Sequence, residues 1–108
     1  MKISFEKLAK DKAVALKISP ELINATTEAA EKIGVVRVRF VREAIEDYLK
    51  LAQTKKLRKF TSKFEHLPQN GKLGMRISTA LAEEMKKIAE SNGRSMFETF
   101  REAIERAL

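Results

Sequence analysis

The sequence contains no cysteine and no tryptophan, and it has only two prolines and four glycines. Without cysteine the chain can form neither disulfides nor thiolate metal sites, which suits a reducing compartment. The N-terminus lacks the apolar core of a signal peptide, and no apolar run approaches the length that spans a membrane. We therefore expect a cytoplasmic protein without a membrane partner.

Residues that carry enzymatic chemistry are equally scarce. The single histidine, His66, has no obvious partner near it in the sequence, and we interpret it as a solvated side chain. The chain has no glycine-rich phosphate loop, no metal-ligand spacing and no nucleophile elbow. Its acidic residues are mixed with basic ones, as is typical of solvated helix faces. We expect no enzyme, assign no catalytic or metal-binding residue, and predict no cofactor.

Positive charge is what the chain has in excess, with 22 Lys and Arg against 15 Asp and Glu and a net charge of +7. Such an excess favours an anionic partner. More than half of it lies between residues 51 and 71, where five basic residues accompany one acidic residue. The overall charge is therefore only modest evidence for nucleic-acid binding, and the charges on the predicted strands are more informative.

The chain repeats itself at a spacing of 59 residues. When residues 18–49 are aligned without gaps on residues 77–108, twelve of the 32 positions are identical, where chance would give about two. A repeat of some forty residues is near the lower limit for independent folding, and a single strand has nothing to pair with. The two repeats should therefore fold as one body.

The second repeat is the clearer copy. Residues 72–77 alternate between apolar and polar or small, which predicts a strand with one buried face. Ser78 is a helix N-cap, Asn92-Gly93 ends that helix, and Ser95 with Glu98 forms a capping box that starts another. The apolar stripes predict two buried helix faces: Leu81, Met85, Ile88 and Ala89, then Phe97, Phe100, Ile104 and Leu108.

The first repeat follows the same plan. Residues 13–18 form the predicted strand, Ser19-Pro20 starts a helix that ends at Gly34, and a second helix follows. The predicted buried side chains are Val14, Leu16 and Ile18 on the strand; Leu22, Ala25, Ala29 and Ile33 on the first helix; and Val38, Val41, Ile45, Tyr48 and Leu49 on the second.

The predicted fold is mainly α, with two β-α-α repeats that share one two-stranded antiparallel ribbon. We divide the chain into a basic N-terminal arm (1–12), the first repeat (13–51), a basic linker (52–71) and the second repeat (72–108). Phe60 and Phe64 in the linker could stack on single-stranded bases. We favour packing on the domain, because apolar pairs four residues apart are usually packing positions.

The outward face of the predicted ribbon is cationic and small. Edge protection is one explanation, since charged side chains on exposed strands suppress aggregation. We favour contact with DNA, because three cations and no acid share this face with residues that have little or no side chain. The six candidate base-contacting residues are Ala13, Ala15, Lys17, Lys72, Gly74 and Arg76.

Both repeats resemble the ribbon–helix–helix family of DNA-binding proteins, the class of the Arc and MetJ repressors. The resemblance rests on Lys72-Leu73-Gly74-Met75-Arg76-Ile77 for the strand and Asn92-Gly93-Arg94-Ser95 for the turn. It implies an antiparallel ribbon that enters the major groove of double-stranded DNA, with further copies side by side on the duplex. Two repeats fused in one chain resemble the TraY-type proteins of conjugative plasmids.

The resemblance also implies contacts to DNA phosphates at the start of each repeat's second helix. A helix N-terminus attracts anions, and Arg94, Ser95 and Met96 match the family pattern in the second repeat. The first repeat departs from it, because Val35-Val36 stands in place of Arg-Ser. We expect Arg37 and Arg39 to compensate through their charge.

We expect the two strands of one chain to pair, with a swapped dimer as the competing arrangement. In the expected register Ala15 lies opposite Gly74, Lys17 beside Lys72, and Ala13 beside Arg76. The favoured function is sequence-specific DNA binding by a regulator of transcription. The alternatives are an accessory protein that binds a plasmid transfer origin and partners a relaxase, and an antitoxin.

Overall fold

The structure is a computed structural model that describes residues 12–54, 57 and 59–108. These residues form a mainly helical fold with one two-stranded antiparallel sheet, as predicted. Residues 1–11 of the predicted N-terminal arm lie outside the described residues. The elements in chain order are β1 (Lys12–Ile18), α1 (Pro20–Ile33), α2 (Arg37–Gln53), β2 (Gly71–Ile77), α3 (Thr79–Ser91) and α4 (Met96–Arg106).

The two strands of the chain pair with each other over their whole length. Ala15 lies opposite Gly74 at the centre, so the register is the one predicted. Lys17 pairs with Lys72 towards one end, and Ala13 pairs with Arg76 towards the other. Because side chains alternate across a strand, this register places the large apolar strand residues together on one face of the sheet.

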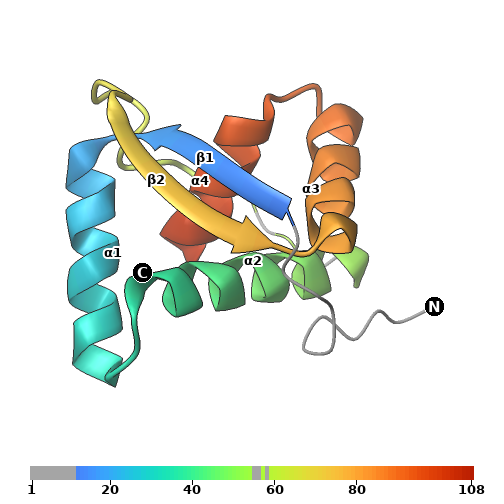
Figure 1. The fold of residues 1–108 in the computed structure, drawn as a ribbon. Coiled ribbons are helices and arrows are strands. Elements are labelled where there is room, and N and C mark those ends of the chain that lie inside the picture. Colours follow the sequence, from blue (N-terminus) through green and yellow to red (C-terminus); the bar gives the residue numbers. More distant parts are fainter. Residues whose placement is uncertain (1–11, 55–56, 58) are drawn as a thin grey trace.

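The helices surround the strands on the sides and from behind. Figure 1 shows α1 and α3 on opposite sides of the sheet, α2 passing below it and α4 behind it. The apolar face of the sheet and the inner faces of all four helices form one hydrophobic core. The fully buried members include Leu16, Ile18, Leu73 and Ile77 from the strands, with Leu22, Ile45, Met85 and Ile104 from the helices.

Local signals set the helix ends where the sequence predicted them. Ser19 and Ser78 cap α1 and α3, and each hydroxyl accepts a hydrogen bond from the backbone N–H three residues on. Gly34 and Gly93 follow the first helix of each repeat with φ of 75° and 63°, a left-handed conformation that glycine adopts without strain.

The predicted inner face of α1 was wrong in part. Its buried residues are Leu22, Thr26 and Ala30, whereas Ile33 is 61% exposed. Thr26 can be buried because its hydroxyl donates a hydrogen bond to the Leu22 carbonyl at 2.7 Å. The predicted inner face of α4 was wrong at its two ends, because Phe97 and Leu108 are 43% and 47% exposed.

The second half of the linker is fastened to the domain. The Glu105 carboxylate accepts hydrogen bonds from the Ser62 hydroxyl and from the Lys63 backbone N–H. The Arg106 guanidinium lies over the Phe60 ring at 4.9 Å from its centroid, and Phe64 packs against the core. The predicted packing of the two phenylalanines is therefore confirmed.

We predict that two glycines of β2 respond oppositely to the same substitution. A Cβ at Gly71 would lie 2.8 Å from the Ile18 carbonyl oxygen, whereas a Cβ at Gly74 would meet nothing within 4 Å. Gly71→Ala should lower the free energy of unfolding by about 1–3 kcal/mol through overpacking. Gly74→Ala should raise it by up to about 1 kcal/mol, because the unfolded chain loses freedom. Urea denaturation measures both, and equal effects would contradict this prediction.

Candidate nucleic-acid interface

The outward face of the sheet consists entirely of exposed residues. Neither strand contains an acidic residue, and the small residues occupy the centre of the face. All six residues predicted for base contact lie on this face and are exposed: Ala13, Ala15, Lys17, Lys72, Gly74 and Arg76. The result is a cationic ribbon with two lysines towards one end and an arginine towards the other.

One residue that the sequence analysis did not single out supports this face. Arg42 of α2 donates hydrogen bonds from Nε and Nη2 to the Arg76 carbonyl oxygen, each at 3.2 Å. It thereby ties the last part of β2 to the helix beneath it. Only the tertiary fold brings these two residues together, since they are 34 positions apart in the sequence.

The start of α4 has the capping box that the sequence predicts. The Ser95 hydroxyl accepts a hydrogen bond from the Glu98 N–H at 3.1 Å, and the Glu98 carboxylate accepts one from the Ser95 N–H at 3.2 Å. The hydrogen bonds from the Ser95 backbone and side chain lower the pKa of Glu98 below its usual value of 4.5. Met96 follows as the first residue of the helix.

Arg94 is directed inward rather than left in solvent. Its guanidinium pairs with the Glu102 carboxylate, and its Nε lies 3.8 Å from Glu98. Glu102 is buried, and it also accepts a hydrogen bond from Arg106 Nε at 2.9 Å. Burial, and then the nearby charge of Glu102, raise the pKa of the Tyr48 hydroxyl above its usual value. Two carboxylates therefore compensate the charge of Arg94, which the sequence had suggested for phosphate contact.

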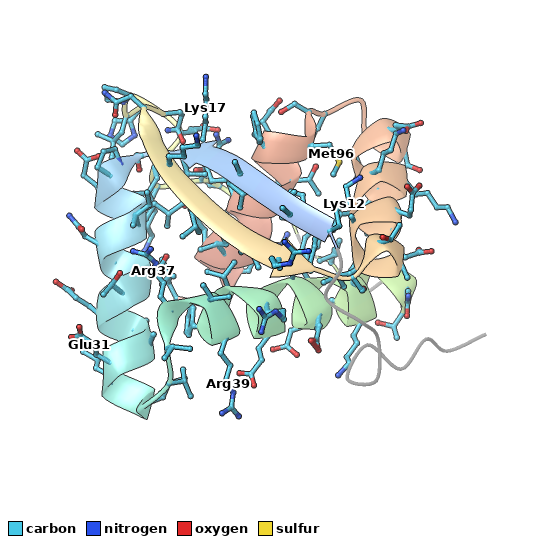
Figure 2. The ribbon with its side chains drawn as sticks, in the orientation of Figure 1. Lys12, Lys17, Glu31, Arg37, Arg39 and Met96 are labelled. Atoms are coloured by element: carbon cyan, nitrogen blue, oxygen red, sulfur yellow. The ribbon has the colours of Figure 1, made fainter. Side chains whose placement is uncertain are left out.

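The start of α2 is built differently. Its N-cap, Val36, provides no side-chain hydrogen bond. Arg37 packs back on α1, and its Nη1 donates to the Thr27 hydroxyl at 3.4 Å. Arg39 forms an ion pair with Glu43 at 3.2 Å, and Figure 2 shows it pointing away from the strands. The structure therefore does not bring Arg39 together with the other predicted phosphate contacts.

The starts of α2 and α4 lie on opposite sides of the ribbon. In Figure 2, Arg37 lies to the left of the two strands and Met96 to their right, while Lys17 projects outward from one end. The outward face is thus bordered by one helix N-terminus on each side. This arrangement can place cationic side chains in a groove while helix ends approach the groove's two edges.

Comparison with protein-family models, with curated proteins and with solved structures finds no match.

In residues 12–54, 57 and 59–108, no group of three or more His, Asp or Glu side chains could hold a metal ion. Among the same residues, no helix combines the length and apolarity that crossing a membrane requires.

We predict a pH dependence of stability that originates at the start of α4. The folded state lowers the pKa of Glu98, so its contribution is complete above about pH 4.5 and is lost as the pH falls through the lower folded pKa. Glu98→Gln should be less stable than wild type at pH 7, and this difference should shrink towards pH 2.

Urea denaturation between pH 2 and pH 7 measures this effect. Glu90→Gln is the matched control, because it removes an exposed carboxylate from α3 that caps no helix. Its stability should follow the wild-type pH profile. A constant difference between Glu98→Gln and wild type across the whole range would show that the capping carboxylate does not titrate as described.

Proposed function

We propose that this chain binds double-stranded DNA with its β1–β2 ribbon in the major groove. The observation that carries the proposal is the outward face of the ribbon, which is exposed, cationic, free of acidic residues and small at its centre. The major groove is about 12 Å wide and admits a two-stranded ribbon. Nearly bare backbone at Ala15 and Gly74 lets the centre of the ribbon approach the bases closely.

The chemistry at the two ends of the ribbon suits base edges. Lysine and arginine donate hydrogen bonds to O6 and N7 of guanine, and a methyl group contacts the methyl of thymine. Lys17 and Lys72 would recognise guanine at one end. At the other end Arg76 would recognise guanine, and Ala13 would contact thymine.

The pairing of the strands supports a tandem ribbon–helix–helix arrangement within one chain. Ala15 and Gly74, which pair at the centre, occupy the same position in the two repeats because they are 59 residues apart. The register is therefore symmetric about this pair, as it would be about the twofold axis of a dimer. The two repeats also share one core, which fits a single-chain counterpart of a dimer.

Phosphate contacts would come from the helix starts that border the ribbon. The first N–H groups of a helix have no partner within the helix, and they attract anions. The backbone N–H groups at Met96 would serve the second repeat, with Ser95 and Arg94 shaping the turn before it. Arg37 would serve the first repeat, and we leave Arg39 out because it points away from the strands.

We propose regulation of transcription as the biological role. A protein that occupies a specific duplex site can exclude or recruit other proteins there without any chemistry of its own. Neither the transfer-origin role nor the antitoxin role has a structural observation in its favour.

Arg76→Ala should weaken binding to the specific site by about 1–3 kcal/mol, the value of a bidentate contact between arginine and guanine. Arg39→Ala is the matched control, because it removes the same charge from the side of the molecule that points away from the ribbon. Titration of labelled duplex at physiological salt measures the affinities, and circular dichroism checks the fold. Equal losses in the two variants would mean that Arg76 acts only through net charge.

We also predict an asymmetric recognition element for each chain. The two strands present different residues, and only one of the two turns has a capping serine, so the halves of the site should differ. Sites that bind several chains should be direct repeats rather than palindromes. Selection from random duplexes tests this prediction. Perfect dyad symmetry within the footprint of one chain would show that the differences between the strands are not read.

A further inference from the structure

The outward face of β2 continues beyond the first residue of the strand. From Pro68 to Ile77 the residues alternate without interruption between exposed and at least half-buried. Alternation with a period of two is the property of extended backbone. Asn70 directly precedes β2, and its exposure continues the alternation that Lys72, Gly74 and Arg76 follow within the strand.

Both neighbours of Asn70 are in close contact with the rest of the domain. The Gln69 side chain accepts a hydrogen bond from the Ser19 N–H at 3.1 Å, and it donates to the carbonyls of Phe64 at 2.8 Å and Leu67 at 2.7 Å. Gly71 sits so close to the end of β1 that a Cβ would lie 2.8 Å from the Ile18 carbonyl oxygen. These contacts preorganise Asn70, so presenting its side chain would cost little conformational entropy.

The carboxamide of Asn70 is exposed, and it makes no hydrogen bond to any residue in the described part of the chain. A carboxamide combines one acceptor with two donors. It can accept a hydrogen bond from N6 of adenine while it donates one to N7, which is the bidentate pattern that distinguishes adenine in the major groove. Asn70 is the only carboxamide on this face among the described residues 68–77.

We infer that Asn70 is a specificity-determining residue that reads an adenine next to the lysine-rich end of the ribbon. The inference rests on the proposed function. Residues of a strand are spaced about 3.3 Å apart and base pairs about 3.4 Å apart. If the strand follows the groove, Asn70 meets the duplex about two base pairs beyond Lys72.

This contact exists at one end of the ribbon only. The residue that corresponds to Asn70 in the first repeat is Asp11, which lies outside the described residues and carries a carboxylate instead of an amide. A carboxylate has no donor for adenine N7. The asymmetric site therefore extends further beside Lys17 and Lys72 than beside Ala13 and Arg76.

Selection from random duplexes with wild type, Asn70→Ala and Asn70→Asp tests the inference. Wild type should enrich an adenine at one flank of its site. Asn70→Ala should retain the remaining preferences and lose this one, with roughly 5- to 140-fold weaker binding to the wild-type site. Asn70→Asp, which is nearly isosteric, should shift the preference at that position to cytosine, because a carboxylate accepts a hydrogen bond from cytosine N4.

Asn24→Ala is the matched control, because it removes an exposed carboxamide from α1. It should leave both the selected site and the affinity unchanged. Thermal unfolding of each variant confirms that the fold is retained.

The other outcomes would overturn either the proposed function or the role of Asn70. Wild type that enriches no site overturns the proposed function itself. An enriched site that stays unchanged in both Asn70 variants leaves DNA binding intact but overturns the role of Asn70. Asn70→Ala could also lose the same affinity whichever base stands at the flank. This outcome would overturn the role of Asn70 in reading adenine, because it identifies a phosphate contact.

Discussion

The structure depends on the pairing of the two strands around Ala15 and Gly74. Each strand places three apolar side chains on one face, and neither strand alone provides a surface wide enough to cover the helices. Side by side, the strands bury Leu16, Ile18 and Leu73 completely. Burying each such side chain contributes about 1.5–3 kcal/mol. Because the core draws on all six elements, loss of this pairing would expose the inner faces of the helices in both repeats.

The parts of the fold that neighbouring residues determine could be predicted from the sequence. Strand alternation, the Ser19 and Ser78 caps and the central register all follow from local patterns and from the repeat. The buried face of a helix is set instead by what packs against it, and this is why Ile33 and Phe97 are exposed against expectation. Arg94 shows the same limit at the candidate site. The sequence places a cation before α4, but only the fold brings it onto the buried carboxylate of Glu102.

The helix starts on the two sides of the ribbon are stabilised in different ways. Next to the start of α4, the buried Glu102 carboxylate pairs with both Arg94 and Arg106. Its counterpart in the first repeat, Glu43, is exposed and pairs only with Arg39 among the contacts described. Charged pairs at the surface contribute little, whereas a buried carboxylate needs all its partners. The turn before α4 is therefore the more sensitive of the two to substitution.

The pairing of non-identical strands also has a consequence for how such a protein changes over generations. In a dimer of identical chains every substitution appears twice, so a residue that improves one half of the surface must also be acceptable in the other. Here Ala15 faces Gly74, and each can be replaced without altering its counterpart. A single nucleotide change therefore alters one half of the molecule at a time. Selection can refine the two halves for different tasks while one gene keeps them in equal amounts.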